Sequence, residues 1–222
     1  MSTKMSHVLT ALCGIVGTIT LVTSFVINPA PPPGLTISQL ADWATAHRTL
    51  ILLGGWLQGM GSLLTVIFVF ALVHLAGAAQ RFVGWVTFLA GVSILMVSLI
   101  EITFYISAVQ ATLSGDATAG TISTGLIKAT QHIFLIAPAL LLPLGVVILG
   151  SHILPRVLGY LALALGAALQ VFGLLGLFNV LQPVIDVLLI VQSIWFLAAA
   201  ITLIFRPTTT TSTSTATTMT AQ

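Results

Sequence analysis

One carboxylate, Glu101, stands inside a long apolar stretch of the sequence, 19 residues after Phe82. Ser98 and Tyr105 come three residues before it and four residues after it, so in a helix the three side chains share one face. If the stretch crosses a membrane, an ionisable group there costs about 3 kcal/mol or more and needs a polar partner. Glu101 is therefore the first residue whose chemistry has to be explained.

Other apolar stretches carry polar groups that could reach the same depth. Arg48 and Gln58 belong to the run before Glu101, and Gln131 and His132 begin the run after it. One interpretation is structural: Glu101 pairs with Arg48 or His132 and holds the helices together. The other is a pocket that binds a proton, a cation or an amine-bearing ligand. The candidate site residues are Glu101, His132, Tyr105, Arg48, Gln131 and Gln58.

The sequence offers few other residues that could bind a cofactor or a metal or act in catalysis. His47 and His74 bracket one run and His132 and His152 another, which would suit haem only if the ligands came from two helices, because His47 and His74 are about 40 Å apart along a helix. An H-E-x-x-H zinc motif is missing, and no aspartates pair within the apolar runs. We expect no catalytic residue, no metal and no cofactor, with haem as an alternative.

The whole chain has the composition of a membrane protein. Of its 222 residues, 58% are hydrophobic and 5% are charged, against about 25% charged in a soluble domain. About 20 apolar residues in a helix cross the bilayer, and β-strand alternation is missing, so we expect an all-α polytopic bundle of six transmembrane helices. The six runs lie near residues 8–27, 49–75, 82–108, 129–150, 157–178 and 184–205.

The remaining segments are short. We expect a transmembrane domain over residues 1–206, with the first run as a retained anchor rather than a cleaved signal peptide. A helical pattern over about 36–47 predicts a short external helix on the membrane surface. The Thr/Ser-rich tail, residues 207–222, has almost no apolar side chains and is expected to be disordered.

Basic residues predict the orientation. With both termini in the cytoplasm, four basic residues are internal and two, Arg48 and Lys128, are external, which follows the positive-inside rule. The four internal residues are Lys4, Arg81, Arg156 and Arg206.

Two segments of the sequence resemble each other and suggest an internal repeat. The motif R-x-x-G-W from Arg81 returns 75 residues later as R-x-x-G-Y from Arg156, and in each copy a second glycine follows the first by seven residues. The match predicts that helices two and three are duplicated as helices four and five. The alternative is that helices leaving the cytoplasm share a preference for basic, aromatic and small residues at their starts.

The stretch LPRVLGYLALALGAALQVFGLLG, together with six spans and an external helix, resembles a family of bacterial six-helix inner-membrane proteins known only as a domain of unknown function. The resemblance covers nearly the whole chain and implies this topology and a bacterial inner (cytoplasmic) membrane. It supplies no activity, substrate or catalytic residue.

These observations predict a non-enzymatic binding or interaction module that lies in the lipid bilayer, as a homo-oligomer or as a subunit of a larger membrane complex. A formal charge of +2 without a basic cluster excludes nucleic acid as a partner. One alternative is a small transporter or proton-coupled carrier that uses an outer-leaflet Glu/His cluster. A second alternative is a haem-binding electron carrier.

Overall fold

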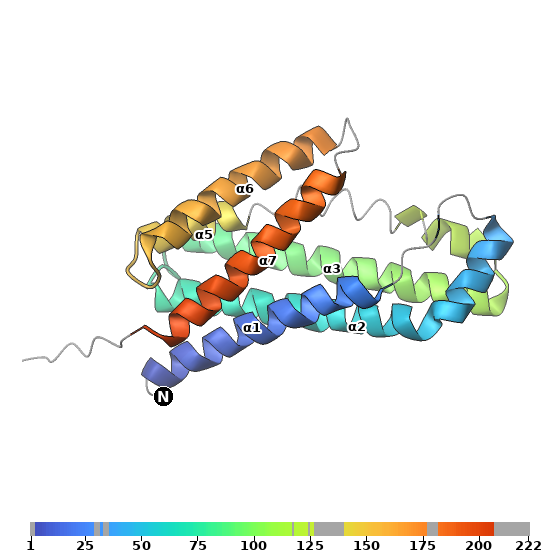
Figure 1. Cartoon of the computed structure of the whole chain (residues 1–222), viewed down its shortest axis with the longest axis horizontal. Coiled ribbons are helices and arrows are strands. Elements are labelled where there is room, and N and C mark those ends of the chain that lie inside the picture. The colour runs from blue at the N-terminus through green and yellow to red at the C-terminus, as the bar shows by residue number, and fades with distance from the viewer. Residues whose placement is uncertain are drawn as a thin grey trace, which may run out of the picture.

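The chain folds into a bundle of long helices (Figure 1). The computed structural model describes residues 3–28, 32, 36–116, 118–123, 125–126, 140–176 and 182–206. Its helices are α1 (Thr3–Ile27), α2 (Ile37–Leu75), α3 (Phe82–Ser114), α5 (Leu141–Leu149), α6 (Arg156–Gly176) and α7 (Gln182–Ile204). All except α5 contain a stretch long and apolar enough to cross a membrane. The predicted all-α, membrane-type bundle is confirmed.

The described residues contain five candidate spans rather than the six predicted. The fourth predicted run, 129–150, is represented by α5, whose nine residues extend only about 13 Å. Residues 129–139 of that run and the tail 207–222 lie outside the described residues.

Helix α2 begins well before its apolar run. The Thr36 side chain accepts a hydrogen bond from the backbone of Gln39, and the Gln39 side chain accepts one from the backbone of Thr36, which together form a capping box. Neither proline nor glycine occurs between residues 37 and 53 to interrupt the helix. The segment 36–47, predicted as a short helix on the membrane surface, therefore forms the cap and first turns of α2.

Helices α2 and α3 form an antiparallel hairpin that extends beyond the other helices (Figure 1). Gly77, with φ of +66°, lies in the tight turn between them. At the far end of α1, a methyl group on Gly54 of α2 would lie only 3.0 Å from Cβ of Asn28. The part of α2 that precedes Gly54 therefore lies past the end of α1, and its first turns bend away from the direction of the rest of the helix (Figure 1).

Two apolar clusters stabilise the bundle. The larger one contains fully buried side chains from α2, α5 and α7, among them Phe68, Leu144 and Leu203. The smaller one, which we call the outer cluster, lies near the far end of the hairpin and consists of Ala44, Ile51 and Val109 with Trp43 and Tyr105 packed against them. Between the two clusters, α2 and α3 also bring buried polar side chains together.

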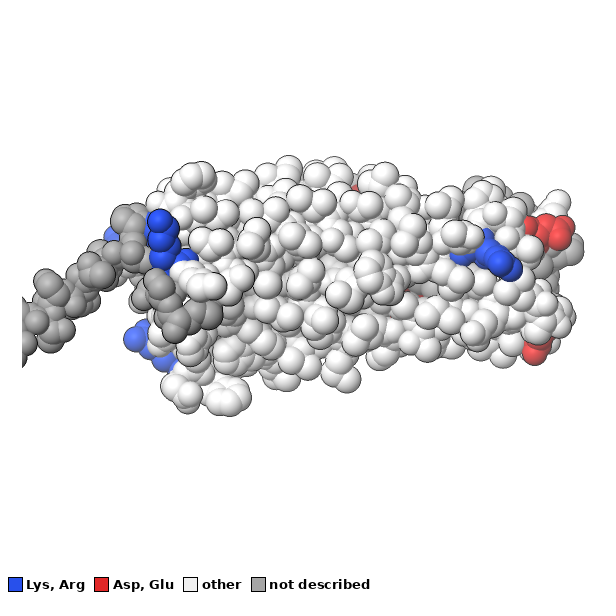
Figure 2. Space-filling model, turned by 90° about the horizontal axis from the view of Figure 1, so that it is seen from below, with Lys and Arg blue, Asp and Glu red and all other residues white. Residues whose placement is uncertain are grey.

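Apart from Glu101, most of the charged side chains visible in Figure 2 lie at the two ends of the bundle. The face shown in Figure 2 is almost free of charge between these ends, as expected of a surface that meets lipid. We call the end with the α2–α3 turn the basic end, because the helix termini there carry Lys4, Arg81, Arg156 and Arg206. The opposite end carries charge of both signs, with Asp42 and Arg48 on α2 and Asp116 after α3.

Candidate functional site

Two side-chain hydrogen bonds connect α2 to α3 inside the bundle. Nε2 of Gln58 donates to Oε2 of Glu101 at 2.7 Å. One turn closer to the basic end, the hydroxyls of Ser62 and Ser98 are 2.9 Å apart and share a hydrogen bond. All four residues are buried, with 1% to 7% of their surface exposed. We call this set the polar seam.

Helical spacing explains how the seam forms. Gln58 and Ser62 are four residues apart on α2, and Ser98 and Glu101 are three apart on α3, so each pair lies on one face of its helix. Because the helices are antiparallel and joined by a short turn, residues at equal distance from the turn face each other. The seam therefore has two rungs at successive turns of the hairpin.

Two glycines bring the helices close enough for these contacts. A methyl group on Gly59 would lie 3.0 Å from Cδ1 of Ile102, and one on Gly55 would lie 3.5 Å from Cγ2 of the same residue. Small residues four apart are a common means of close helix approach in membranes. A larger side chain at Gly59 would need Ile102 of α3 to move, whereas Gly55 leaves room for a methyl group.

The seam is chemically suited to holding two helices in register. An amide N–H can donate to a carboxyl group whether or not that group carries a proton, so the bond does not depend on a cation. Interhelical hydrogen bonds in membranes contribute about 0.6 kcal/mol on average and at most about 1.7 kcal/mol. Two such bonds add modest stability, and they select one rotation and one height of α2 against α3.

Of the predicted site residues, the structure brings together Glu101 and Gln58. Tyr105 lies one turn further out on α3, half-buried in the outer cluster. Arg48 is exposed and precedes Gln58 by ten residues, or about 15 Å along α2. The predicted ion pair between Glu101 and Arg48 is therefore wrong, because the two groups lie at different heights in the hairpin.

The remaining candidates lie elsewhere. His132 and Gln131 fall outside the described residues. His47, near the far end of α2, stacks on Trp43 and its Nδ1 is 2.8 Å from the Trp43 carbonyl oxygen. His74 and His152 are exposed near the basic end. Within the described part of the chain, no group of three His, Cys, Asp or Glu side chains is placed to hold a metal ion.

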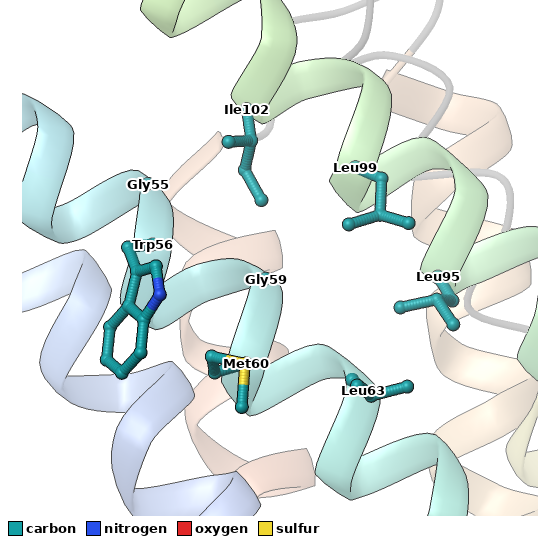
Figure 3. Close-up of a pocket in the computed structure, with 8 residues that line it drawn as sticks. All are labelled: Gly55, Trp56, Gly59, Met60, Leu63, Leu95, Leu99 and Ile102. Atoms are coloured by element: carbon teal, nitrogen blue, oxygen red, sulfur yellow. The ribbon is translucent and has the colours of Figure 1, made fainter.

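Neither the pairing of Ser62 with Ser98 nor a groove on the outer surface of the hairpin was predicted from the sequence (Figure 3). The groove has a volume of about 280 Å³ and opens on the side of α2 and α3 that faces away from the other helices. The sequence signal for it is the small-xxx-small spacing of Gly55 and Gly59. Its lining residues are Gly55, Trp56, Gly59, Met60, Leu63, Leu95, Leu99 and Ile102.

No family model matches this chain, and no curated protein or solved structure matches it either. The polar seam and the groove are therefore interpreted from the residues of this chain alone.

Proposed function

We propose that the chain is a multi-pass membrane protein that acts as a non-enzymatic binding or interaction module centred on the α2–α3 hairpin. The observation that carries the proposal is the hydrogen bond from Gln58 to Glu101. It gives the buried carboxyl group a neutral partner on the neighbouring helix, as expected for a structural contact. The module works as a homo-oligomer or as a subunit of a larger membrane complex.

The shape of the hairpin supports this role. The polar seam fixes α2 against α3 in one arrangement, and a surface held in one arrangement loses less entropy when it binds. On the lipid side the hairpin carries the groove, and its far end lies past the end of α1. Both surfaces are available to a partner without rearrangement of the core.

We infer six transmembrane helices, with both termini in the cytoplasm of a bacterium and the chain in its inner membrane. In this topology α5 belongs to the fourth predicted span, the run 129–150. The concentration of basic residues at one end of the bundle supports the orientation. The resemblance to the bacterial six-helix family supports the number of spans and the location.

We also infer that the α2–α3 hairpin is duplicated as α5–α6. A methyl group on Gly84 would lie 3.3 Å from Cγ1 of Val73, and one on Gly159 would lie 3.2 Å from Cγ2 of Ile148. The second pair of residues equals the first shifted by the 75-residue offset of the repeated motif. A shared sequence motif and a shared contact at the same offset support a common origin of the two hairpins.

The main alternative, a proton-coupled carrier, assigns a different task to Glu101. Proton flux into liposomes that contain the purified protein and an enclosed pH-sensitive dye tests it. We expect wild type and Glu101→Gln to give the same flux as empty liposomes under an imposed pH gradient. A flux that wild type supports and Glu101→Gln abolishes would overturn the proposal in favour of the carrier. A protonophore added at the end controls for intact vesicles.

The haem alternative has an equally direct test. We expect the visible absorbance spectrum of the purified protein to lack a Soret band. A Soret band that disappears when His47 or His132 is replaced would assign the chain to electron transfer instead.

A further inference from the structure

Four cationic side chains at the basic end have no acidic side chain beside them. Lys4, Arg81 and Arg156 are exposed there, and Arg206 is partly exposed. The face in Figure 2 shows blue side chains without red ones at this end. The carboxylate side chains of the chain number four, all lie in its described part, and each is remote from the basic end: Asp42, Glu101, Asp116 and Asp186. The basic end therefore carries positive charge that no carboxylate of this chain neutralises.

Two of these arginines lie beside an exposed aromatic ring. Trp85 follows Arg81 by four residues at the start of α3, and Tyr160 follows Arg156 by four residues at the start of α6. Residues four apart share one face of a helix. Trp85 is 60% exposed and Tyr160 is 63% exposed, so both faces are turned away from the interior of the bundle. We call these two sets the Arg–aromatic pairs.

The aromatic rings indicate the depth of the arginines in the membrane. Indole and phenol rings are enriched at the membrane–water interface, where the ring meets hydrocarbon and the N–H or O–H group meets polar atoms. Four residues of helix rise about 6 Å, so each arginine lies one turn further from the bilayer centre than its ring. The long arginine side chain can then extend among the lipid phosphates. The pairs are thus positioned for lipid headgroups rather than for a partner in the aqueous phase.

We propose that the basic end binds anionic phospholipids, whose phosphate groups contact Arg81 and Arg156. A guanidinium group binds phosphate through two parallel N–H···O bonds. A zwitterionic headgroup would add its own positive charge to a cluster that has no carboxylate to offset it, so a lipid with net negative charge is preferred. The inference goes beyond the proposed function, because it requires that the chain spans a membrane and requires neither Glu101 nor a particular orientation.

Electron spin resonance of spin-labelled lipids tests the proposal in phosphatidylcholine vesicles that contain the purified protein. It measures the association constant of phosphatidylglycerol relative to phosphatidylcholine, and with identical acyl chains the apolar contacts cancel. A basic residue near the surface favours an anionic lipid about fivefold, and the signal averages over all lipids in contact, so we expect a ratio of about 2 to 5. A ratio of about 1 would overturn the proposal and leave the cations to an acidic partner in water.

Substitutions of exposed arginines connect the ratio to the Arg–aromatic pairs. Arg81→Gln and Arg156→Gln should each lower it, and the double variant should lower it by about half or more. Arg48→Gln removes the same charge from an exposed position at the opposite end, where Asp42 and Asp116 offset it, and is the matched control. We expect Arg48→Gln to retain the ratio of wild type. An equal loss in Arg48→Gln would contradict the proposal, because the net charge of the protein would then determine the preference.

Two measurements on the wild-type protein make the test independent of the variants. Raising NaCl from about 0.1 M to about 1 M shortens the Debye length from about 10 Å to about 3 Å and should lower the ratio. An unchanged ratio would overturn the proposal, because the preference would not be electrostatic. Inorganic phosphate added at constant ionic strength should leave the ratio unchanged. A loss of the preference would show that the arginines bind free phosphate instead of a lipid headgroup, and would also overturn it.

Discussion

Glu101 accepts its hydrogen bond from the uncharged amide of Gln58. The charge of this partner determines how much stability the substitution Glu101→Gln removes. If the partner were a cation, Glu101→Gln would leave a buried positive charge without compensation. With Gln58 as the partner, glutamine at position 101 still offers a carbonyl oxygen to the same N–H. Shape and hydrogen bonding at this position therefore matter more for stability than charge.

The hydrogen bond between Ser62 and Ser98 can be tested by single and double substitution. Ser62→Ala and Ser98→Ala each remove one partner of a buried hydroxyl pair. We expect each to lower the free energy of unfolding by about 0.6 kcal/mol, and by no more than about 1.7 kcal/mol. The double variant should lose less than the sum, because the bond can be removed only once. Chemical unfolding in mixed micelles measures this, and strictly additive losses would contradict a direct bond.

Among the helices, α1 and α2 approach each other backbone to backbone at two glycines, whereas the glycines between α2 and α3 meet side chains. A methyl group on Gly61 would lie 2.6 Å from the backbone nitrogen of Leu21, and one on Gly17 would lie 2.7 Å from the backbone nitrogen of Thr65. Backbone atoms cannot move aside as a side-chain tip can. These glycines therefore set the distance between α1 and α2.

The same substitution at two positions of α2 tests this difference. Gly61→Ala should cost about 1 to 3 kcal/mol, because the two helices must separate. Gly55→Ala meets Ile102 only at 3.5 Å and should leave stability unchanged or slightly raised, since alanine favours helix. Thermal unfolding in detergent, followed by the loss of the monodisperse peak, compares the two. Equal effects would mean that the α1–α2 contact is looser than described.

Hydropathy predicted the five long apolar helices, but it did not predict where α2 begins. An apolar run marks the part of a helix that meets lipid, and it contains no information about polar turns that continue beyond it. The start of α2 depends on the Thr36 capping box and on the lack of a helix breaker before Gly54. These local signals were present in the sequence, and they indicate one continuous helix.

The partner of Glu101 could also have been found from the sequence. Gln58 was among the candidates, but Arg48 and His132 were preferred as partners because opposite charges attract. In an antiparallel hairpin the residue numbers of facing positions have a nearly constant sum, and 58 with 101 and 62 with 98 satisfy this rule. What the sequence could not supply is the rotation of each helix about its axis, which depends on packing against Gly55 and Gly59.

For the whole molecule, the distribution of charge predicts the orientation in the membrane. The basic end should face the cytoplasm, and the far end of the α2–α3 hairpin should face outward. After Cys13→Ser, the variant Ala46→Cys places a thiol on the exposed start of α2, and Gln80→Cys places one in the turn at the basic end. An impermeant maleimide should label residue 46 in intact cells and residue 80 only after permeabilisation. The reverse pattern would contradict the orientation.

Glu101 holds α3 against α2 through its bond to Gln58, and a double-mutant cycle of these two residues, followed by global unfolding, tests this role. We expect Glu101→Gln to stay within about 0.5 kcal/mol of wild type, and Glu101→Ala and Gln58→Ala each to lose about 1 to 3 kcal/mol. The double alanine variant should show a coupling of about 0.6 to 1.7 kcal/mol. If Glu101→Ala were instead as stable as wild type or more stable, with no coupling to Gln58, the carboxyl group would be one retained at the expense of stability, and the structural role would be contradicted.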